Sequence, residues 1–292
     1  MANKYVYVMA IPVLTFFIIF AYVPMYGILM AFQDYKPQYG ILHSTWIGLK
    51  NFSDFFKSYY CLRLVSNTFI LNLYDLIFAF PAPIIFALLL NELKSNKFKK
   101  TVQTITYMPY FISLVVVAGL IVEFTSSRGF IIDMLSLFGF EKKSLLGDAK
   151  YFRSIFVISN IWQYLGFNSI IYIAALAGID QELYEAATID GAGRWSKMFY
   201  ITIPCISSTI IIMLILRIGN MMNIGYEKII LLYNPSTYVT ADVISSFVYR
   251  KGLQEMNFSY STAVGLFNSM INFALLVIAN KLSRKYSETS LW

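Results

Sequence analysis

The chain has 292 residues, of which 58% are hydrophobic and only 13% are charged. Soluble domains carry about 25% charged residues, so this composition excludes an ordinary soluble globular protein. The 23 lysines and arginines exceed the 16 acids and give a net charge of +7. Such an excess can attract nucleic acid. Here the basic residues stand between long apolar runs, so membrane topology accounts for them and no nucleic-acid partner is expected.

Repeated apolar segments have the length of about 20 residues that a bilayer requires of a helix. We expect membrane helices at about Tyr5–Ala31, Asn67–Leu90, Val102–Phe124, Ser154–Ala177, Pro204–Asn223 and Ala263–Asn280. Prolines within them, such as Pro109, are tolerated where neighbouring groups satisfy the freed carbonyls. The pattern predicts an all-α membrane protein with six transmembrane helices.

The short flanks of these helices are rich in basic residues. They are Lys4, Lys94, Lys97, Lys99, Lys100, Lys281, Arg284 and Lys285. Because flanking Lys and Arg mark the cytoplasmic side, both termini and the loop after the second helix are predicted to be cytoplasmic. By alternation, the segment between helices four and five is cytoplasmic too. The longer loops at about 33–66, 125–153 and 224–262 then face outward.

The cytoplasmic segment before helix five predicts two short helices with a turn between them. Asp180 is placed to cap the first helix, and Gly191 suits the left-handed position that ends it. Pro204 then begins helix five, where its missing N–H has no cost. The expected apolar anchors of the second short helix are Trp195, Met198 and Phe199.

Two readings of this segment remain open on physical grounds. Ala186 and Ala187 give the first short helix a small face that suits close packing. The element could enter a groove on a cytoplasmic protein and act as a rigid lever. It could equally lie on the lipid surface as an interfacial helix.

A family resemblance favours the first reading. The order Glu185-Ala186-Ala187, then Asp190-Gly191-Ala192, then Phe199, Ile203 and Pro204, resembles the EAA loop of binding-protein-dependent ABC importer permeases. The outer segment 48–52, Gly-Leu-Lys-Asn-Phe, is similar to an element of the sugar branch of that family. Segments near 226–235, 241–243 and 262–267 resemble permeases for complex oligosaccharides derived from polysaccharides.

The resemblance implies a type I importer fold and a division of the chain. Residues 1–66 would form an N-terminal transmembrane helix with an extracellular loop. Residues 67–281 would form the permease core of five helices, with the coupling loop at 180–204. Residues 282–292 would be a cytoplasmic tail.

The resemblance also implies partners. A second, homologous permease subunit would complete a heterodimer in the bacterial cytoplasmic membrane, two ATPase subunits would dock on the coupling loops, and an extracellular solute-binding protein would deliver an oligosaccharide. ATP and Mg²⁺ would be bound by the ATPase, so no cofactor is expected in this chain, which has no phosphate-binding G-x-x-x-x-G-K-[ST] segment. The implied ATPase-coupling residues are Glu185, Ala186, Ala187, Asp190, Gly191, Ala192 and Arg194.

Polar side chains within membrane spans are candidates for the substrate pathway, because they are costly there unless they face a cavity or a partner. The candidates are Arg217, Asn220 and Asn223 on helix five, Trp162, Tyr164 and Asn168 on helix four, and Asn268 and Asn272 on helix six. The helix-five residues are three apart and are expected near one helix face. Packing between helices is the alternative role for each asparagine and for the aromatic residues.

The charged residues within or beside the spans lead to two further expectations. Arg217 could pair with the carboxylate of an acidic sugar, such as a uronate. Asp75 and Glu123 are expected near outer helix ends, where water or basic loop residues would neutralise them.

Other functions have less support from the residues. A permease for another solute class would share the same loop. A stand-alone secondary transporter would need its own coupling-ion site and is often built from inverted repeats, of which we find none. A membrane enzyme is disfavoured because the single His43 has no nucleophile or metal-ligand motif beside it. We therefore expect no catalytic and no metal-binding residues.

Overall fold

The computed structural model describes residues 4–287 and consists almost entirely of helices. Five of them are long and apolar enough to cross a membrane: Tyr5–Phe32, Tyr59–Asn91, Leu114–Ser136, Arg194–Gly219 and Phe258–Lys285. The pair Ala149–Ala177 and Gln181–Ile189, bent by 68°, makes a sixth candidate if it is counted as one span. The expected all-α membrane fold is confirmed, and its β-structure is a single two-residue antiparallel pair within the described residues.

The chain divides into two compact units, each described here by itself. Unit 1 comprises Met1–Leu62 and Phe247–Met270. Its elements are α1 (Lys4–Phe17), the π-helical η1 (Ile18–Tyr22), the 3-10 helix η2 (Val23–Phe32), β1 (Gln33–Asp34), α2 (Gly40–His43), β2 (Thr45–Trp46), α3 (Lys50–Lys57), η8 (Arg250–Gln254) and the first part of α16 (Phe258–Ser287).

The core of unit 1 is built from aromatic rings. Phe55 of α3 is 1% exposed, and its ring centroid lies 5.5 Å from that of Phe267 and 6.4 Å from that of Tyr260. By contrast, the most apolar stretch of Tyr5–Phe32 has 0% of its residues buried. This first span therefore contributes little to the core and leaves its sides to lipid or to another subunit.

Unit 2 comprises Arg63–Ser246 and Ile271–Trp292. Its elements are α4 (Tyr59–Tyr74), η3 (Asp75–Ala79), α5 (Pro81–Asn91), α6 (Asn96–Tyr107), η4 (Met108–Phe111), α7 (Leu114–Thr125), α8 (Phe130–Ser136), η5 (Leu145–Gly147), α9 (Ala149–Ala177), α10 (Gln181–Ile189), α11 (Arg194–Lys197), η6 (Met198–Thr202), α12 (Ile203–Gly219), α13 (Tyr226–Leu232), η7 (Pro235–Thr237), α14 (Tyr238–Ala241), α15 (Ile244–Tyr249) and the end of α16. The helices α4, α15 and α16 have residues in both units.

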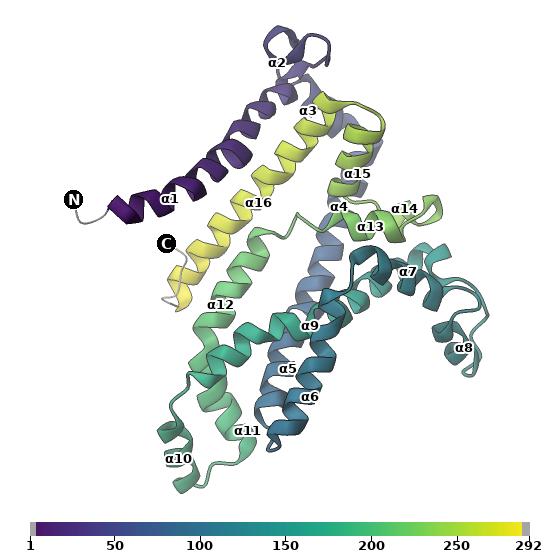
Figure 1. The fold of residues 1–292 in the computed structure, drawn as a ribbon. Helices are drawn as coiled ribbons and strands as arrows, with labels where there is room; N and C mark the ends of the chain where they lie inside the picture. Colours follow the sequence, from purple (N-terminus) through teal and green to yellow (C-terminus); the bar gives the residue numbers. More distant parts are fainter. Residues whose placement is uncertain (1–3, 288–292) are drawn as a thin grey trace. The chain divides into compact units, whose positions relative to one another are not determined.

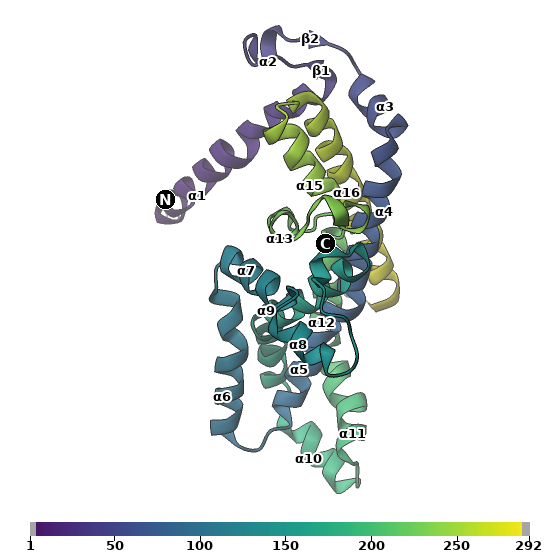
Figure 2. The same cartoon turned by 90° about the vertical axis from the view of Figure 1, so that its right-hand side faces the viewer.

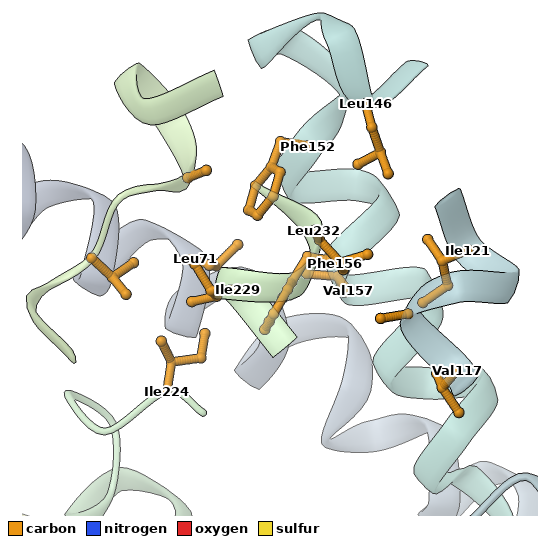
Figure 3. Close-up of a cluster of buried hydrophobic side chains, with 13 residues drawn as sticks. Leu71, Val117, Ile121, Leu146, Phe152, Phe156, Val157, Ile224, Ile229 and Leu232 are labelled. Atoms are coloured by element: carbon orange, nitrogen blue, oxygen red, sulfur yellow. The ribbon is translucent and has the colours of Figure 1, made fainter. Parts of the chain in front are cut away.

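The long helix α9 organises unit 2, since it packs against α5, α6, α12 and α14 (Figures 1 and 2). At its N-terminal half, Phe152 and Phe156 meet Leu232 and Ile229 of α13 in a buried apolar cluster (Figure 3). Phe152, at 0% exposed, and Ile229, at 0% exposed, lie at the centre of this cluster. The short helix α13 is therefore held against α9 by apolar packing.

The third predicted helix, Val102–Phe124, is wrong as a continuous element. The helix α6 ends at Tyr107, and a 3-10 turn containing Pro109 follows before the chain becomes extended. Proline lacks the N–H that would continue the helix. Ser113 then begins α7, because its Oγ accepts from the Val116 N–H at 3.4 Å.

The fifth predicted helix also needs correction at its end. It was expected to reach Asn223, but α12 ends at Gly219, and Asn220 has non-helical φ and ψ angles of −104° and 14°. At its start, the prediction that Pro204 begins helix five is wrong, because α11, η6 and α12 form one helical span, Arg194–Gly219, and Pro204 lies within it. The residues after Gly219 form turns that lead to α13.

A glycine sets the spacing of two helices. A Cβ added at Gly166 of α9 would lie 2.3 Å from the Thr106 carbonyl oxygen of α6. No side chain fits at that distance, so glycine permits the close approach of α6 and α9.

Candidate functional site

A cavity of about 450 Å³ lies within unit 2, walled by η3, α5, α9, α12 and the segment leading into α13. Its polar lining residues are Asp75, Asn160, Tyr164, Asn168, Tyr172, Arg217, Asn220, Asn223, Glu227 and Lys228. Apolar groups, among them Phe80, Pro83 and Leu165, complete the wall. This mixture suits a ligand that has apolar faces and several hydroxyl groups.

Four of the polar side chains form one continuous chain of contacts. Asp75 is ion-paired with Arg217 through Oδ2. Asn160 Nδ2 donates to Asp75 Oδ1 at 3.0 Å, and Lys228 Nζ donates to Asn160 Oδ1 at 2.8 Å. Lys228 Nζ also donates to Gln163 Oε1 at 3.3 Å. These contacts tie together η3, α9, α12 and α13, which wall the cavity.

The position of Asp75 contradicts its expected place near an outer helix end. The span begins at Tyr59, eight residues before the predicted start at Asn67, so Asp75 lies in the middle of Tyr59–Asn91. It is 5% exposed and begins the π-helical segment η3. The expectation that water or loop residues neutralise it is wrong, because its partner is Arg217 of another span. Glu123, the other acid in that expectation, is exposed.

The pairing of Arg217 changes its chemical role. Its guanidinium is bound to a carboxylate of this chain, while its side chain remains 35% exposed. An arginine that already has a carboxylate partner offers less charge to a ligand than an unpaired one. The guanidinium instead fixes α12 against η3.

Lys228 is a functional candidate that the sequence reasoning missed. It lies in a loop between spans, yet it is 4% exposed and lines the cavity. Burial lowers the pKa of its amine to about 8, and the nearby Asp75 carboxylate opposes part of that shift. The available signal was a lysine directly before the apolar run 229–232, Ile-Ile-Leu-Leu.

Four predicted pathway residues meet at the cavity in addition to Arg217. Tyr164 and Asn168 reach it from α9, and Asn220 and Asn223 reach it from the turns after α12. The prediction that Asn220 and Asn223 share one face of a helix with Arg217 is wrong, since the helix has ended. The turn nevertheless brings all three to the same wall.

The other three predicted pathway residues lie elsewhere. Trp162 lines a separate, almost wholly apolar cavity of about 470 Å³ beside α7 and α8. Asn272 Oδ1 accepts from the Met222 N–H at 2.8 Å, which satisfies a backbone group after α12. Asn268 is 7% exposed, and its Oδ1 has no hydrogen-bond partner in the described part of the chain.

The first short helix of the segment 180–204 and the turn after it have the local structure that the sequence predicted, whereas the second short helix is continuous with α12. Asp180 Oδ1 accepts from the Glu182 N–H at 3.0 Å and so caps α10. Gly191 has a φ of +77°, the left-handed conformation that glycine favours. The Ala192 N–H donates to the Ala187 carbonyl at 2.8 Å and closes the turn between α10 and α11.

The two faces of this segment differ. Tyr184 and Met198 pack against a buried cluster formed with α5, α9 and α12, and the Tyr184 hydroxyl is 2.9 Å from Thr202 Oγ1. Trp195 and Phe199, two of the expected apolar anchors, are 72% and 56% exposed. Only Met198 of the three predicted anchors packs inward.

The implied coupling residues follow the outer face of the segment. Glu185, Ala186, Asp190, Gly191 and Arg194 are exposed, and Ala187 and Ala192 are half-buried. The rings of Trp195 and Phe199 stack with their centroids 6.2 Å apart. The segment therefore presents an apolar and charged surface that the rest of the described chain leaves uncovered.

Together, the fold and the two sites define a multi-pass membrane protein with a polar cavity and a short-helix loop. Residues 63–288 match the family described as binding-protein-dependent transport system inner membrane component. The match spans more than half of the chain, which therefore belongs to this family of ABC importer permeases. It is a transport subunit and not an enzyme.

Curated relatives cover almost the whole chain. Protein LplB of Bacillus subtilis (strain 168) is 44% identical over 99% of this chain and 92% of its own length. The polygalacturonan/rhamnogalacturonan transport system permease protein YteP of the same organism is 43% identical over 99% of this chain and 91% of its own length.

A solved structure shares the fold. It is a bacterial ABC transporter involved in the import of the acidic polysaccharide alginate, one chain of which superposes with a TM-score of 0.91 at 43% identity. The superposition covers 98% of this chain and 97% of that chain. The expected type I importer fold is confirmed. A second structure of the alginate transporter contains a periplasmic protein with a bound alginate pentasaccharide.

Proposed function

We propose that this chain is one of two different permease subunits of an ATP-driven importer for acidic oligosaccharides in a bacterial cytoplasmic membrane. The chain forms half of the pathway, an extracellular binding protein delivers the sugar, and two ATPase subunits drive the cycle. The observation that carries the proposal is the cavity of unit 2, whose wall combines hydroxyl and amide groups with two buried or half-buried cations.

The cavity lining supports an oligosaccharide as the cargo. The Tyr164 hydroxyl and the amides of Asn168 and Asn223 can exchange hydrogen bonds with sugar hydroxyls. Phe80 and Leu165 offer apolar surface to the C–H faces of a sugar ring. The whole-chain similarity to a polygalacturonan/rhamnogalacturonan permease and to an alginate importer supports an acidic sugar in particular.

The outer face of the segment 180–204 supports an ATPase as its partner. A large exposed apolar pair beside exposed charges is typical of a protein interface. The Tyr184–Thr202 contact and the packing of Met198 fix the segment to α9 and α12. A push on α10 would therefore reach the helices that wall the cavity. Glu185 and Gly191 occupy the motif positions that the family resemblance ties most closely to docking.

The orientation follows from charge. Lys97 and Lys100 are exposed on α6 and Lys99 is half-buried there, and the segment 180–204 is placed on the same side by alternation of the spans. We infer that both termini and this segment face the cytoplasm, where an ATPase finds ATP and Mg²⁺.

The test is transport by the complete complex in liposomes that contain ATP, with the binding protein outside. The Glu185→Lys and Gly191→Asp double variant should abolish uptake of labelled oligogalacturonate and reduce the amount of ATPase that co-purifies. Its amount in the membrane should match that of the wild type. Glu141→Lys, the same charge reversal on an exposed residue of an outer loop, should transport normally.

Two results would overturn the proposal. Uptake by the purified chain alone, without an ATPase, would show a self-sufficient transporter. Normal uptake by the double variant would remove the coupling role of the segment.

A further inference from the structure

The two cations of the cavity differ in their partners. Arg217 is bound to the Asp75 carboxylate, whereas both hydrogen bonds of the Lys228 amine go to neutral amide oxygens, those of Asn160 and Gln163. An ammonium group has three N–H donors. The third donor of Lys228 has no nitrogen or oxygen acceptor among the described residues; besides its two hydrogen bonds, the amine, which lines the cavity, lies 5.7 Å from the centroid of the Phe156 ring.

A buried ammonium without a direct carboxylate partner is costly to keep. Moving a charge out of water is unfavourable unless an opposite charge or several hydrogen bonds replace the water. Asn160 links Lys228 to Asp75, but the Asp75 carboxylate is already paired with Arg217. Two cations thus share one buried anion, and the excess positive charge lies on the Lys228 side.

Glu227 does not remove this excess. It lines the same cavity but is exposed, and neighbouring residues on a helix point in different directions. No ion pair joins Glu227 to Lys228 in the described part of the chain. The positive charge is therefore local to the Lys228 amine rather than spread over the cavity wall.

We propose that Lys228 is the specificity-determining residue that binds a uronate carboxylate of the oligosaccharide in the cavity, and that Arg217 is a structural partner of Asp75. This inference rests on the proposed function and names the group that selects acidic sugars. The third N–H of Lys228 meets the carboxylate while Asn160 and Gln163 hold the amine in place. Tyr164 and Asn168, on the same helix as Asn160, take the sugar hydroxyls.

The same geometry has a purely structural reading, in which Lys228 only fastens α13 to α9. The two readings differ in what replaces lysine. A fastening role needs hydrogen-bond donors to Asn160 and Gln163, which a glutamine can supply. A carboxylate-binding role needs the positive charge, which arginine keeps and glutamine loses.

The experiment compares Lys228→Gln and Lys228→Arg with the wild type in the reconstituted complex. Uptake of trigalacturonate and of its neutral methyl ester is measured with the same binding protein. For each substrate, the uptake rate of the variant is divided by that of the wild type. In Lys228→Gln, uptake of the acid should fall about tenfold, the loss expected for one charge-assisted hydrogen bond. Uptake of the ester should fall much less.

The charge-preserving variant and a matched control complete the design. Lys228→Arg should keep most of the uptake of the acid. Lys143→Gln, the same change on an exposed lysine of an outer loop, should leave both substrates unaffected. The amount of each variant in the membrane and its co-purifying ATPase are recorded, so a folding defect is recognised directly.

The outcomes are separable. Equal losses for acid and ester in Lys228→Gln, or a loss of the acid in Lys228→Arg as large as in Lys228→Gln, would overturn the assignment and leave the importer function standing. Unchanged uptake of the acid in Lys228→Gln would overturn it as well. If the wild-type complex transports no oligosaccharide at all, the proposed function fails, and the inference fails with it.

Discussion

The cavity and the segment 180–204 are two regions of unit 2 that differ in whether their side chains find partners within the chain. In the cavity, Asp75 and Lys228 are buried, and Asp75, Asn160 and Arg217 have their partners within the chain. In the segment, Trp195 and Phe199 are apolar and exposed, and nothing in the described chain covers them. The contacts of the first region form when the chain folds, whereas the exposed rings of the second region need another protein to cover them. Variants of the cavity should therefore change stability or selectivity, and variants of the segment should change assembly.

The largest effect is expected from breaking the buried ion pair. Arg217→Gln leaves the Asp75 carboxylate in the span without its partner, which should destabilise the protein by about 3 kcal/mol. Adding Asp75→Asn removes the stranded charge and should restore most of that loss. Thermal unfolding of the purified complex measures both. A double variant less stable than the single one would contradict the pairing. The cavity would then no longer differ from the segment 180–204 in having its polar partners within the chain.

A smaller effect is expected from the outer face of the segment. Trp195→Ala with Phe199→Ala removes two exposed rings and should weaken ATPase binding by about 2 kcal/mol, roughly 30-fold. The stability of the isolated permease should hardly change, because neither ring is packed. Titration of the ATPase onto the permease in detergent gives the affinity. Tyr184→Phe, which loses an inward contact on the same segment, is the control and should keep normal affinity.

The next effect concerns the packing of α9, the helix that carries Asn160. Gly166→Ala places a Cβ within 2.3 Å of a backbone oxygen of α6, so the two helices must move apart. The cost should be about 1 to 2 kcal/mol in thermal stability. Gly265→Ala is the matched control, since nothing lies within 4 Å of its added Cβ. Equal stability of the two variants would show that the close approach is dispensable.

The smallest effect is a pH dependence of selectivity. The pKa of Lys228 is lowered to about 8, so the amine is charged below that pH and becomes neutral above it. Uptake of trigalacturonate relative to its methyl ester should fall about threefold between pH 7 and pH 8.5. The other titratable side chains that line this cavity are Asp75, Tyr164, Tyr172, Arg217 and Glu227. A ratio that rises or stays constant over this range would contradict the role of the charged amine.

Local rules were enough to predict the first short helix and the turn of the segment 180–204, but not that its second helix continues into α12. The cap at Asp180 and the left-handed Gly191 depend only on residues within one or two turns, and both are as expected. Most apolar spans were also found, because their signal is composition over about 20 residues. The break after Tyr107 was missed because proline within a membrane span is often tolerated.

The cavity was only partly predictable, for reasons of distance along the chain. Asp75 and Arg217 are 142 residues apart in the sequence, and no local sequence pattern predicts their contact. Lys228 donates a hydrogen bond to Asn160, which is 68 residues earlier in the sequence. It does so from a loop helix that the hydropathy pattern places outside the membrane spans. The turn that brings Asn220 and Asn223 to the wall depends on where α12 ends, a boundary that hydropathy does not define.

The separation of Asp75 from Arg217 has a consequence for biogenesis. A ribosome adds about 5 to 20 residues per second, so α12 is completed on the order of 10 to 30 s after the span that carries Asp75. During that interval the carboxylate enters the bilayer without its arginine, at an insertion cost of about 3 kcal/mol. The span Tyr59–Asn91 must therefore be apolar enough to insert with an unpaired acid, or wait beside the translocation channel until α12 arrives.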